Sequence, residues 1–350
     1  MAEDIAIEEV VKARQGKDVT LVDVRSPQEF REGTIPGSVN VPILDDEERK
    51  IVGTLYNHAG THAAKEKGLE IVAAKLPAFI RTIRELPGKK IVFCWRGGMR
   101  SKAAATVLSL MGVDVCRLIG GYRSYRKWVV QTLENFELKP ECIVINGYTG
   151  AGKSRLLRAL DQKGYPVLDL EAMASHRGSF FGHIGLEPHN QKTFDALLLD
   201  RLLELNNQPY ILMEAESTRI GKAVMPDFLV RGKERGRMIV IDLPIEERVK
   251  NILADYDPVA HKAECIRAYE RIRERIHVPV AKQISGHLER DEFSQAIRLM
   301  LEYYYDKRYE YAMNQYRENE VWIRAANVED AVRKTEEQLH RWGFAAMRHA

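Results

Sequence analysis

The chain of 350 residues is longer than a single hydrophobic core usually fills, so two domains are expected. With 45% hydrophobic and 29% charged residues and no low-complexity tract, its composition excludes a disordered or fibrous protein. The formal net charge of +3 is too small to indicate a polyanionic partner by itself. Acidic residues near the start are wrong for a secretory signal, and no apolar run could span a bilayer, so we expect a cytoplasmic protein.

The first part of the chain alternates short β-branched runs with helical stretches, which predicts an α/β domain over residues 1–135. The helix expected at 103–111 is the clearest, with Ser101 as its N-cap and Gly112 at its end. The runs expected to form buried parallel strands are 19–24, 39–43, 91–94 and 115–119.

The stretch 128–140 is interpreted as the join, because an apolar strand follows it directly. Beyond about Glu246 the chain is mostly amphipathic helix, and Asn327 with Asp330 predicts the start of the last helix. The second domain, residues 136–350, is therefore expected to be α/β with a helical C-terminal part. Its expected strands are 142–145, 166–170, 210–213 and 238–243.

The run IVFCWRGGMRS places Cys94 at the end of an expected strand, just before a helix. Inward-pointing N–H groups, the helix dipole, Arg96 and Arg100 should lower the pKa of this thiol. Gly97 and Gly98 permit a tight curve that cradles an anion. We predict Cys94 to be the nucleophile. No CxxC pair occurs, and the cysteines interpreted as structural are Cys116, Cys142 and Cys265.

The runs 23–30 and 33–40 closely resemble the two upstream signatures of rhodanese-like domains. The five residues between Cys94 and Arg100 also match the spacing of cysteine phosphatases, so hydrolysis of a phosphate ester stays open. A phosphatase needs a general acid for its leaving group, and the loop holds no carboxylate. We therefore favour a persulfide or perselenide carrier at Cys94.

The run GYTGAGKS at 147–154 matches the phosphate-binding pattern G-x-x-x-x-G-K-[ST] between a strand and a helix, and so predicts a P-loop. Backbone N–H groups around Gly147, Gly150 and Gly152 would wrap a diphosphate, Lys153 would neutralise it, and Ser154 would bind Mg²⁺. The motif does not identify the phosphate compound. Candidate carboxylates for the metal are Asp169, Glu214, Glu216 and Asp242. For any single one of them, capping of the next element is the favoured interpretation over metal binding.

The two domains in this order resemble the bacterial tRNA 2-selenouridine synthases. Four further runs, 120–126, 168–171, 176–182 and 214–221, are similar to signatures of that family, so the resemblance covers nearly the whole chain. It implies that the wobble 2-thiouridine of tRNA is first geranylated from geranyl diphosphate. Selenium from selenophosphate then replaces the S-geranyl group. No permanently bound cofactor is implied, and an enzyme that supplies selenophosphate is an expected partner.

The resemblance further implies that Cys94 carries selenium and that the P-loop holds geranyl diphosphate. His176 and Arg177 are expected to bind the diphosphate or the tRNA backbone, and Glu216 and Arg219 are further expected substrate contacts. The stretch 117–128 interleaves cations with aromatic rings and has no acidic residue, which suits a surface that binds unpaired RNA. A solvated helix face that packs its aromatic rings on the neighbouring domain fits the same pattern equally well. The residues predicted to contact tRNA are Arg117, Tyr122, Arg123, Arg126 and Lys127.

Two other functions stay open on the residues alone. One is a nucleotide-hydrolysing regulator whose first domain only binds a partner, and it predicts NTP hydrolysis indifferent to loss of Cys94. The other is a small-molecule kinase to which the first domain supplies sulfur.

Overall fold

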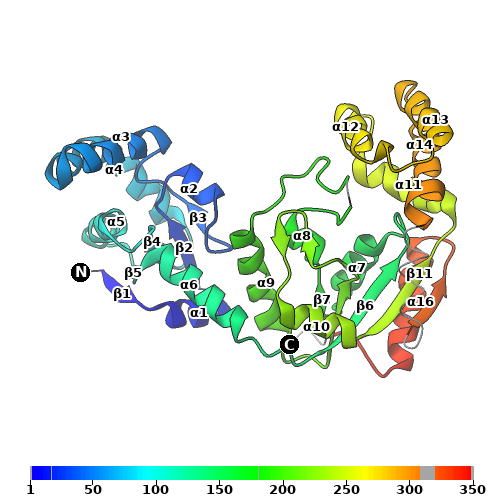
Figure 1. Ribbon diagram of the computed structural model, residues 1–350. Coiled ribbons are helices and arrows are strands. Elements are labelled where there is room, and N and C mark those ends of the chain that lie inside the picture. The colour runs from blue at the N-terminus through cyan, green and yellow to red at the C-terminus, as the bar shows by residue number, and fades with distance from the viewer. Residues whose placement is uncertain (1, 17, 180, 308–319, 348–350) are drawn as a thin grey trace. The chain divides into compact units, whose positions relative to one another are not determined.

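The computed structural model of the protein describes residues 2–16, 18–179, 181–307 and 320–347 (Figure 1). The chain separates into two units, the first of Met1–Asn135 with Asp195–Leu197 and the second of Phe136–Phe194 with Leu198–Ala350. Among the described helices, none combines the length and apolar character that crossing a membrane requires.

The sheet of the first unit consists of parallel strands in the order β1-β5-β4-β2-β3. They are β1 (Glu3–Ile5), β2 (Val19–Asp23), β3 (Val39–Asn40), β4 (Lys89–Phe93) and β5 (Val115–Leu118). The four strands expected from the sequence are confirmed. The three residues of β1 show no alternation of buried and exposed side chains. The strand forms by pairing with β5, more than a hundred residues further along the chain.

The helices of this unit are α1 (Ile7–Gln15), α2 (Pro27–Arg31), α3 (Asp46–His58), α4 (Gly60–Glu85), α5 (Met99–Leu110) and α6 (Gly121–Glu134). The predicted cap at Ser101 is wrong, because α5 begins at Met99 with Gly98 as its N-cap and Ser101 is buried. Gly112 follows the end of α5 with a φ of 72°, as expected of a residue after a helix terminus.

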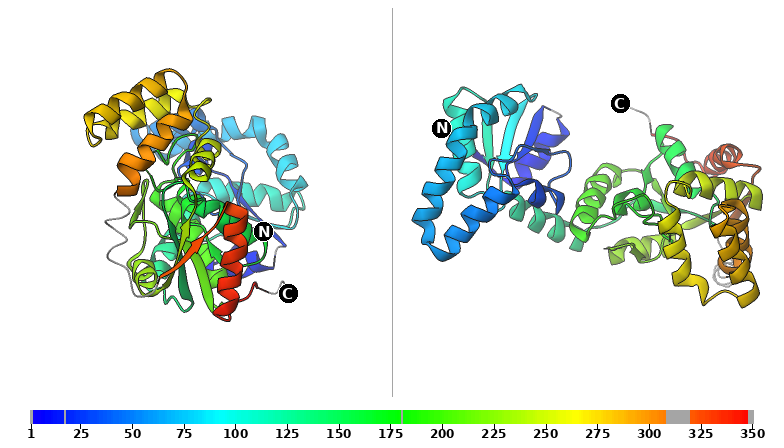
Figure 2. Two further views of the ribbon diagram at one scale, coloured as in Figure 1. Left: turned by 90° about the vertical axis from the view of Figure 1, so that its right-hand side faces the viewer. Right: turned by 90° about the horizontal axis from the view of Figure 1, so that it is seen from above.

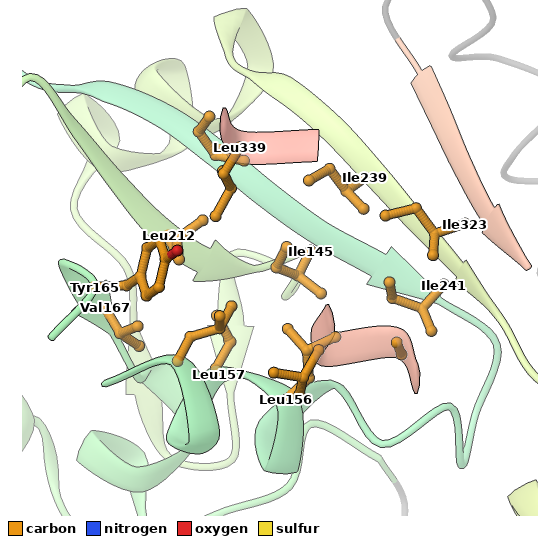
Figure 3. Close-up of a cluster of buried hydrophobic side chains, with 14 of the residues drawn as sticks. Ile145, Leu156, Leu157, Tyr165, Val167, Leu212, Ile239, Ile241, Ile323 and Leu339 are labelled. Carbon is orange, nitrogen blue, oxygen red and sulfur yellow. The ribbon is translucent and has the colours of Figure 1, made fainter. Parts of the chain in front are cut away.

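The second unit also contains a parallel sheet, in the order β12-β11-β6-β8-β7. Its strands are β6 (Glu141–Gly147), β7 (Val167–Leu168), β8 (Tyr210–Glu214), β11 (Arg237–Asp242) and β12 (Glu320–Arg324), with a separate small hairpin of β9 (Arg219–Ile220) and β10 (Ala223–Val224). Leu156 and Leu157 of α7 (Lys153–Gln162) and Leu339 of α16 (Val328–Arg341) pack with Ile145 and Ile241 of the sheet (Figure 3). The expected strands and the α/β class are confirmed.

Helices α8 (Leu170–Ala174), α9 (Gln191–Leu205) and α10 (Asp227–Arg235) complete the part of this unit built around the sheet. The expected helical part is confirmed as a group with a core of its own, which stands at one end of the unit (Figure 2). It comprises α11 (Ile245–Tyr256), α12 (Lys262–Arg273), α13 (Val278–Glu289), α14 (Phe293–Met300) and the π-helix η1 (Leu301–Tyr305). Strand β12 was not expected in this region. The capping start of α16 is confirmed, since Asn327 accepts from the Asp330 N–H.

Candidate functional site

Cys94 is the first residue after β4 and precedes the loop that leads into α5. Its side chain is buried, and its Sγ atom lies 3.2 Å from Oγ of Ser101. Ser101 therefore contacts the thiol instead of capping the helix. The sulfur lies near the N-terminus of α5, where the helix dipole favours negative charge.

The start of the loop after Cys94 is hydrogen-bonded to the first turn of α6, whose N-cap and first residue are the pair Gly120 and Gly121. The backbone N–H of Tyr122 donates to the Cys94 carbonyl at 2.8 Å, and that of Arg123 donates to the Trp95 carbonyl at 2.9 Å. Gly121 has a φ of 60°, and a Cβ atom there would lie 2.1 Å from the Cys94 oxygen. Only glycine permits this close approach. The sequence showed this pair as a family signature, without its role.

Arg100 forms a bidentate ion pair with Glu29, one bond of which measures 3.0 Å. Burial by itself would raise the pKa of Glu29. The hydrogen bonds and positive charge of Arg100 outweigh this effect and hold the pKa of Glu29 below its ordinary value. Glu29 was not singled out by the motifs. The other predicted loop cation, Arg96, is exposed. Glu29 thus holds Arg100 beside the loop, while Arg96 is open to solvent.

The two rhodanese signatures meet beside this loop. The guanidinium of Arg25 is buried against the carboxylate of Asp23 at 2.6 Å and lies 4.4 Å over the ring of Tyr122. Thr34 donates to the same carboxylate at 2.8 Å. Asp23 and Glu29 are therefore both engaged with arginines. Neither is free to be the general acid that a phosphatase would require.

The residues predicted to contact tRNA are placed differently from one another. Tyr122 is 1% exposed beneath Arg25, so its ring is not available to stack on a base, contrary to the prediction. Arg126 is half-buried on α6, whereas Arg123 and Lys127 are exposed on that helix.

Arg117 supports the thiol loop rather than extending into solvent. Its guanidinium pairs with Asp4 at 2.6 Å and donates to the carbonyl of Gly97 at 3.0 Å. Of the five residues, Arg123 and Lys127 are the two whose positions best suit contact with phosphates.

The second loop, residues 147–152, connects β6 to α7 and borders a cavity of about 780 Å³. Gly150 has a φ of 81°, and a Cβ atom there would lie 2.7 Å from the Arg248 carbonyl. Lys153 begins α7, and its Nζ atom donates to the carbonyl of Gly147 at 3.1 Å. Gly147 and Gly152 stand at the two ends of the loop. This strand, loop and helix have the form that binds phosphate through backbone N–H groups.

Ser154 donates a hydrogen bond to the carboxylate of Glu171 on α8. Burial, together with the negative charge of Glu216, raises the pKa of Glu171 to about 7. Glu171 was missed as a candidate, although it closes the run LDLE at the end of a predicted strand. Burial also raises the pKa of Glu216, which lines the same cavity.

The other three proposed carboxylates have structural positions. Asp169 caps α8 by accepting from the N–H of Ala172. Glu214 is fully buried and accepts from the N–H of Leu170 at 3.1 Å. Asp242 pairs with Arg324 at 3.6 Å across β11 and β12. The capping interpretation therefore applies to Asp169, and neither Glu214 nor Asp242 lines the cavity.

We expect the ligand-free protein to lose stability as the pH rises from about 4.5 to about 7. Because the pKa of Glu171 is about 7 in the folded protein, this group loses its proton only around pH 7, whereas the unfolded chain ionises it near 4.5. The folded state therefore binds more protons in this window, and the free energy of unfolding should fall by about 3 kcal/mol before levelling off. Urea titrations of the wild type and Glu171→Gln between pH 4.5 and 8 test this. Equal slopes in both proteins would exclude Glu171 as the cause.

His176, Arg177 and Arg219 line the same cavity as the P-loop. Burial and the nearby positive charges lower the pKa of His176. The Arg177 guanidinium donates to the carbonyl of Ile184 at 2.8 Å and lies 4.8 Å over the ring of Tyr256. The structure thus brings the predicted substrate contacts, Glu216 included, into one cavity with Lys153. Tyr256 is an additional lining residue that no motif indicated.

Two family models match the chain. The model described as the tRNA 2-selenouridine synthase AAA domain matches residues 140–340, and the rhodanese-like domain model matches residues 6–127. A crystal structure of the N-terminal domain of an ATP/GTP binding protein from Clostridium difficile 630 shares 37% identity, with a TM-score of 0.35. It covers 37% of this chain and 99% of that one.

Two curated relatives, both named tRNA 2-selenouridine synthase, align over most of the chain. The protein of Nitrosomonas europaea is 38% identical over 247 residues, which are 68% of this chain and 64% of that protein, somewhat less than two thirds. The protein of Hydrogenovibrio crunogenus is 32% identical over 329 residues, covering 85% of this chain and 90% of its own. The chain belongs to the family of tRNA 2-selenouridine synthases.

Proposed function

We propose that the protein converts the wobble 2-thiouridine of tRNA to 2-selenouridine in two steps, through an S-geranyl intermediate. Membership of the family supports the overall reaction. The observation that carries the proposal is that one chain holds both a P-loop cavity and a thiol in a loop at a helix N-terminus. The first suits a diphosphate donor and the second suits an anionic chalcogen.

In the first step, the sulfur of 2-thiouridine bonds to the first carbon of the geranyl group. The carbon–oxygen bond to the diphosphate breaks, the diphosphate leaves with the bonding electrons, and the ring proton of the uridine passes to solvent. Lys153 and Arg177 border the cavity where that charge develops. Cations placed there stabilise the leaving group more as its charge grows, which lowers the barrier.

In the second step, the Cys94 thiolate attacks the selenium of selenophosphate. The selenium–phosphorus bond breaks with its electron pair going to phosphorus, phosphite leaves, and a perselenide remains on Cys94. The terminal selenium of this perselenide then attacks the ring carbon of the modified base. The S-geranyl group is a better leaving group than the original sulfur, so it departs as geranylthiol when selenium bonds to the ring carbon. Cleaving the bond between selenium and the Cys94 sulfur takes two electrons. The assay therefore includes a thiol reductant. A partner enzyme that makes selenophosphate would supply the donor.

The residues beside the P-loop fit a magnesium ion, which would neutralise charge on the diphosphate. Ser154 donates a hydrogen bond to Glu171. Burial raises the pKa values of Glu171 and Glu216, and the negative charge of Glu216 raises that of Glu171 further. A cation bound between these carboxyls would stabilise their ionised forms. Among the described residues no three His, Cys, Asp or Glu side chains form a metal site. Mg²⁺ usually needs only one or two protein ligands when phosphates complete its shell.

We further propose that α6 contributes to tRNA binding through Arg123 and Lys127. Replacing both by Ala should weaken binding of a thiolated anticodon stem-loop and lower the slope of log K against log salt by about 1 to 2, because two phosphate contacts are lost. Filter binding between low and moderate salt measures the slope. Arg81→Ala, an exposed cation on α4, is the control. An unchanged slope in the double variant would remove α6 from the tRNA site.

Omitting the donors one at a time tests the whole proposal. Purified protein, thiolated tRNA and a thiol are incubated with geranyl diphosphate, with selenophosphate, or with both, and the nucleosides are identified by mass spectrometry. We expect S-geranyl-2-thiouridine with the first donor alone and 2-selenouridine with both. Phosphorylation of a small molecule or plain NTP hydrolysis, with the tRNA unchanged, would favour the other functions considered from the sequence.

A further inference from the structure

A second, apolar cavity lies within the helical part of the second unit, next to the P-loop cavity. It has a volume of about 50 Å³. Five residues line both cavities, namely Thr149, Ser179, Ile252, Tyr256 and Tyr305. Thr149 belongs to the P-loop itself. The two cavities are therefore adjacent, with a shared wall that begins at the phosphate-binding loop.

Beyond the shared wall, the side chains that line the second cavity are all apolar. Leu288 of α13 and Phe293, Ile297 and Met300 of α14 make up much of it. The buried thiol of Cys265 also lines it, and burial raises the pKa of Cys265 to about 11, so this group is uncharged. A base or sugar placed here would lose its hydrogen bonds to water without replacement, whereas a hydrocarbon would not.

Two hydroxyls of the shared wall are engaged with one another. The hydroxyls of Ser179 and Tyr256 lie 3.1 Å apart, and the Tyr256 ring carries the guanidinium of Arg177 at 4.8 Å. On the side that faces the P-loop cavity, the wall therefore carries the cation Arg177. On the side that faces the second cavity, it presents aromatic and aliphatic surface. A ligand that fits both sides has an anionic head and an apolar tail.

We propose that this cavity, defined by Leu288, Phe293, Ile297 and Met300, receives the far end of the hydrocarbon chain of an allylic diphosphate whose head lies on the P-loop. The inference rests on the proposed geranyl transfer and names its tail site. The cavity is small, so it holds the last part of the chain, and the first part passes between Ile252, Tyr256 and Tyr305. The space at Ile297 then sets which chain length is used.

Two substitutions at Ile297 move the chain-length preference in opposite directions. Ile297→Ala enlarges the cavity and should raise kcat/KM for farnesyl relative to geranyl diphosphate by about tenfold. Ile297→Trp fills it and should lower kcat/KM for geranyl diphosphate by at least about tenfold while changing that for dimethylallyl diphosphate by less than about threefold. The acceptor is a thiolated anticodon stem-loop.

Ile284→Ala is the matched control. Ile284 is fully buried in the same hydrophobic cluster, on α13, but does not line the cavity. The control should lose comparable stability while keeping the wild-type ratio of farnesyl to geranyl transfer. If Ile297→Ala and Ile284→Ala give the same ratio, the cavity does not hold the chain.

Direct binding separates this inference from the proposed function. Calorimetric titrations compare geranyl diphosphate with inorganic diphosphate, and the advantage of the geranyl compound in the wild type should largely vanish in Ile297→Trp. That result without any transfer to RNA would contradict the proposed function and leave the tail site standing. The opposite result would be that the wild type transfers the geranyl group, while substitutions at Ile297 leave the ratio of farnesyl to geranyl transfer unchanged. That result would contradict the tail site and leave the proposed function standing.

Discussion

Replacing Cys94 by Ala is expected to abolish formation of 2-selenouridine while leaving geranylation intact. Cys94 is the one cysteine among the four that lies at the junction of a strand end and a helix N-terminus, with Ser101 in contact with its sulfur. Removing a covalent nucleophile typically costs several orders of magnitude, and we expect selenation to fall by at least about a thousandfold. S-geranyl-2-thiouridine should then accumulate, because the P-loop cavity is unchanged.

The control for this experiment is Cys116→Ala. Cys116 is equally buried, on the neighbouring strand β5, but lies outside the loop. Its loss should reduce stability slightly and leave both reactions near the wild-type level. Selenation that survives in Cys94→Ala at the level of the Cys116→Ala control would show that selenium reaches the base without this thiol.

Replacing Lys153 by Ala is expected to suppress geranylation and, through it, selenation from unmodified 2-thiouridine. Lys153 lines the cavity at the P-loop and is the cation that the motif supplies to a bound phosphate. Losing one preorganised group that stabilises the leaving charge should lower kcat/KM by about a hundredfold to a thousandfold. Selenation should be restored when the RNA is supplied already S-geranylated, because the step at Cys94 does not use this lysine.

Lys163→Ala is the control for Lys153→Ala, because it removes a lysine at the opposite end of the same helix, α7. Lys163 follows the end of α7 and pairs with Glu336 at the surface, away from the loop. Its removal should change geranyl transfer by less than about twofold, since exposed ion pairs contribute little. If Lys153→Ala geranylates as well as Lys163→Ala, the diphosphate does not bind at this loop.

The parts of the fold that could be predicted from the sequence are those whose signals are local. The buried strands β2, β4, β6 and β11 show as continuous apolar runs, and the cap of α16 shows as Asn327 followed by Asp330. Strand β1 is too short for a pattern. Strand β12 has an exposed Trp322 at the edge of the sheet and is defined by pairing with β11, some eighty residues earlier. Pairing between distant segments leaves no local trace.

The same distinction separates the predicted from the missed residues of the site. Cys94 and the P-loop each belong to a short strand, loop and helix unit, so spacing alone placed them. Glu29 meets Arg100 across 71 residues, and Tyr256 reaches the Ser179 hydroxyl across 77. Tyr122 was misjudged because aromatic rings between cations look alike whether they stack on bases or, as here, support a buried arginine.

A single time course tests the central claim most directly. Protein, thiolated anticodon stem-loop, geranyl diphosphate, selenophosphate and a thiol are combined, and the nucleosides are followed by mass spectrometry. S-geranyl-2-thiouridine should rise first and then decline as 2-selenouridine appears. An unmodified stem-loop, or 2-selenouridine formed at the same rate without geranyl diphosphate, would contradict the cooperation of the two sites on one RNA.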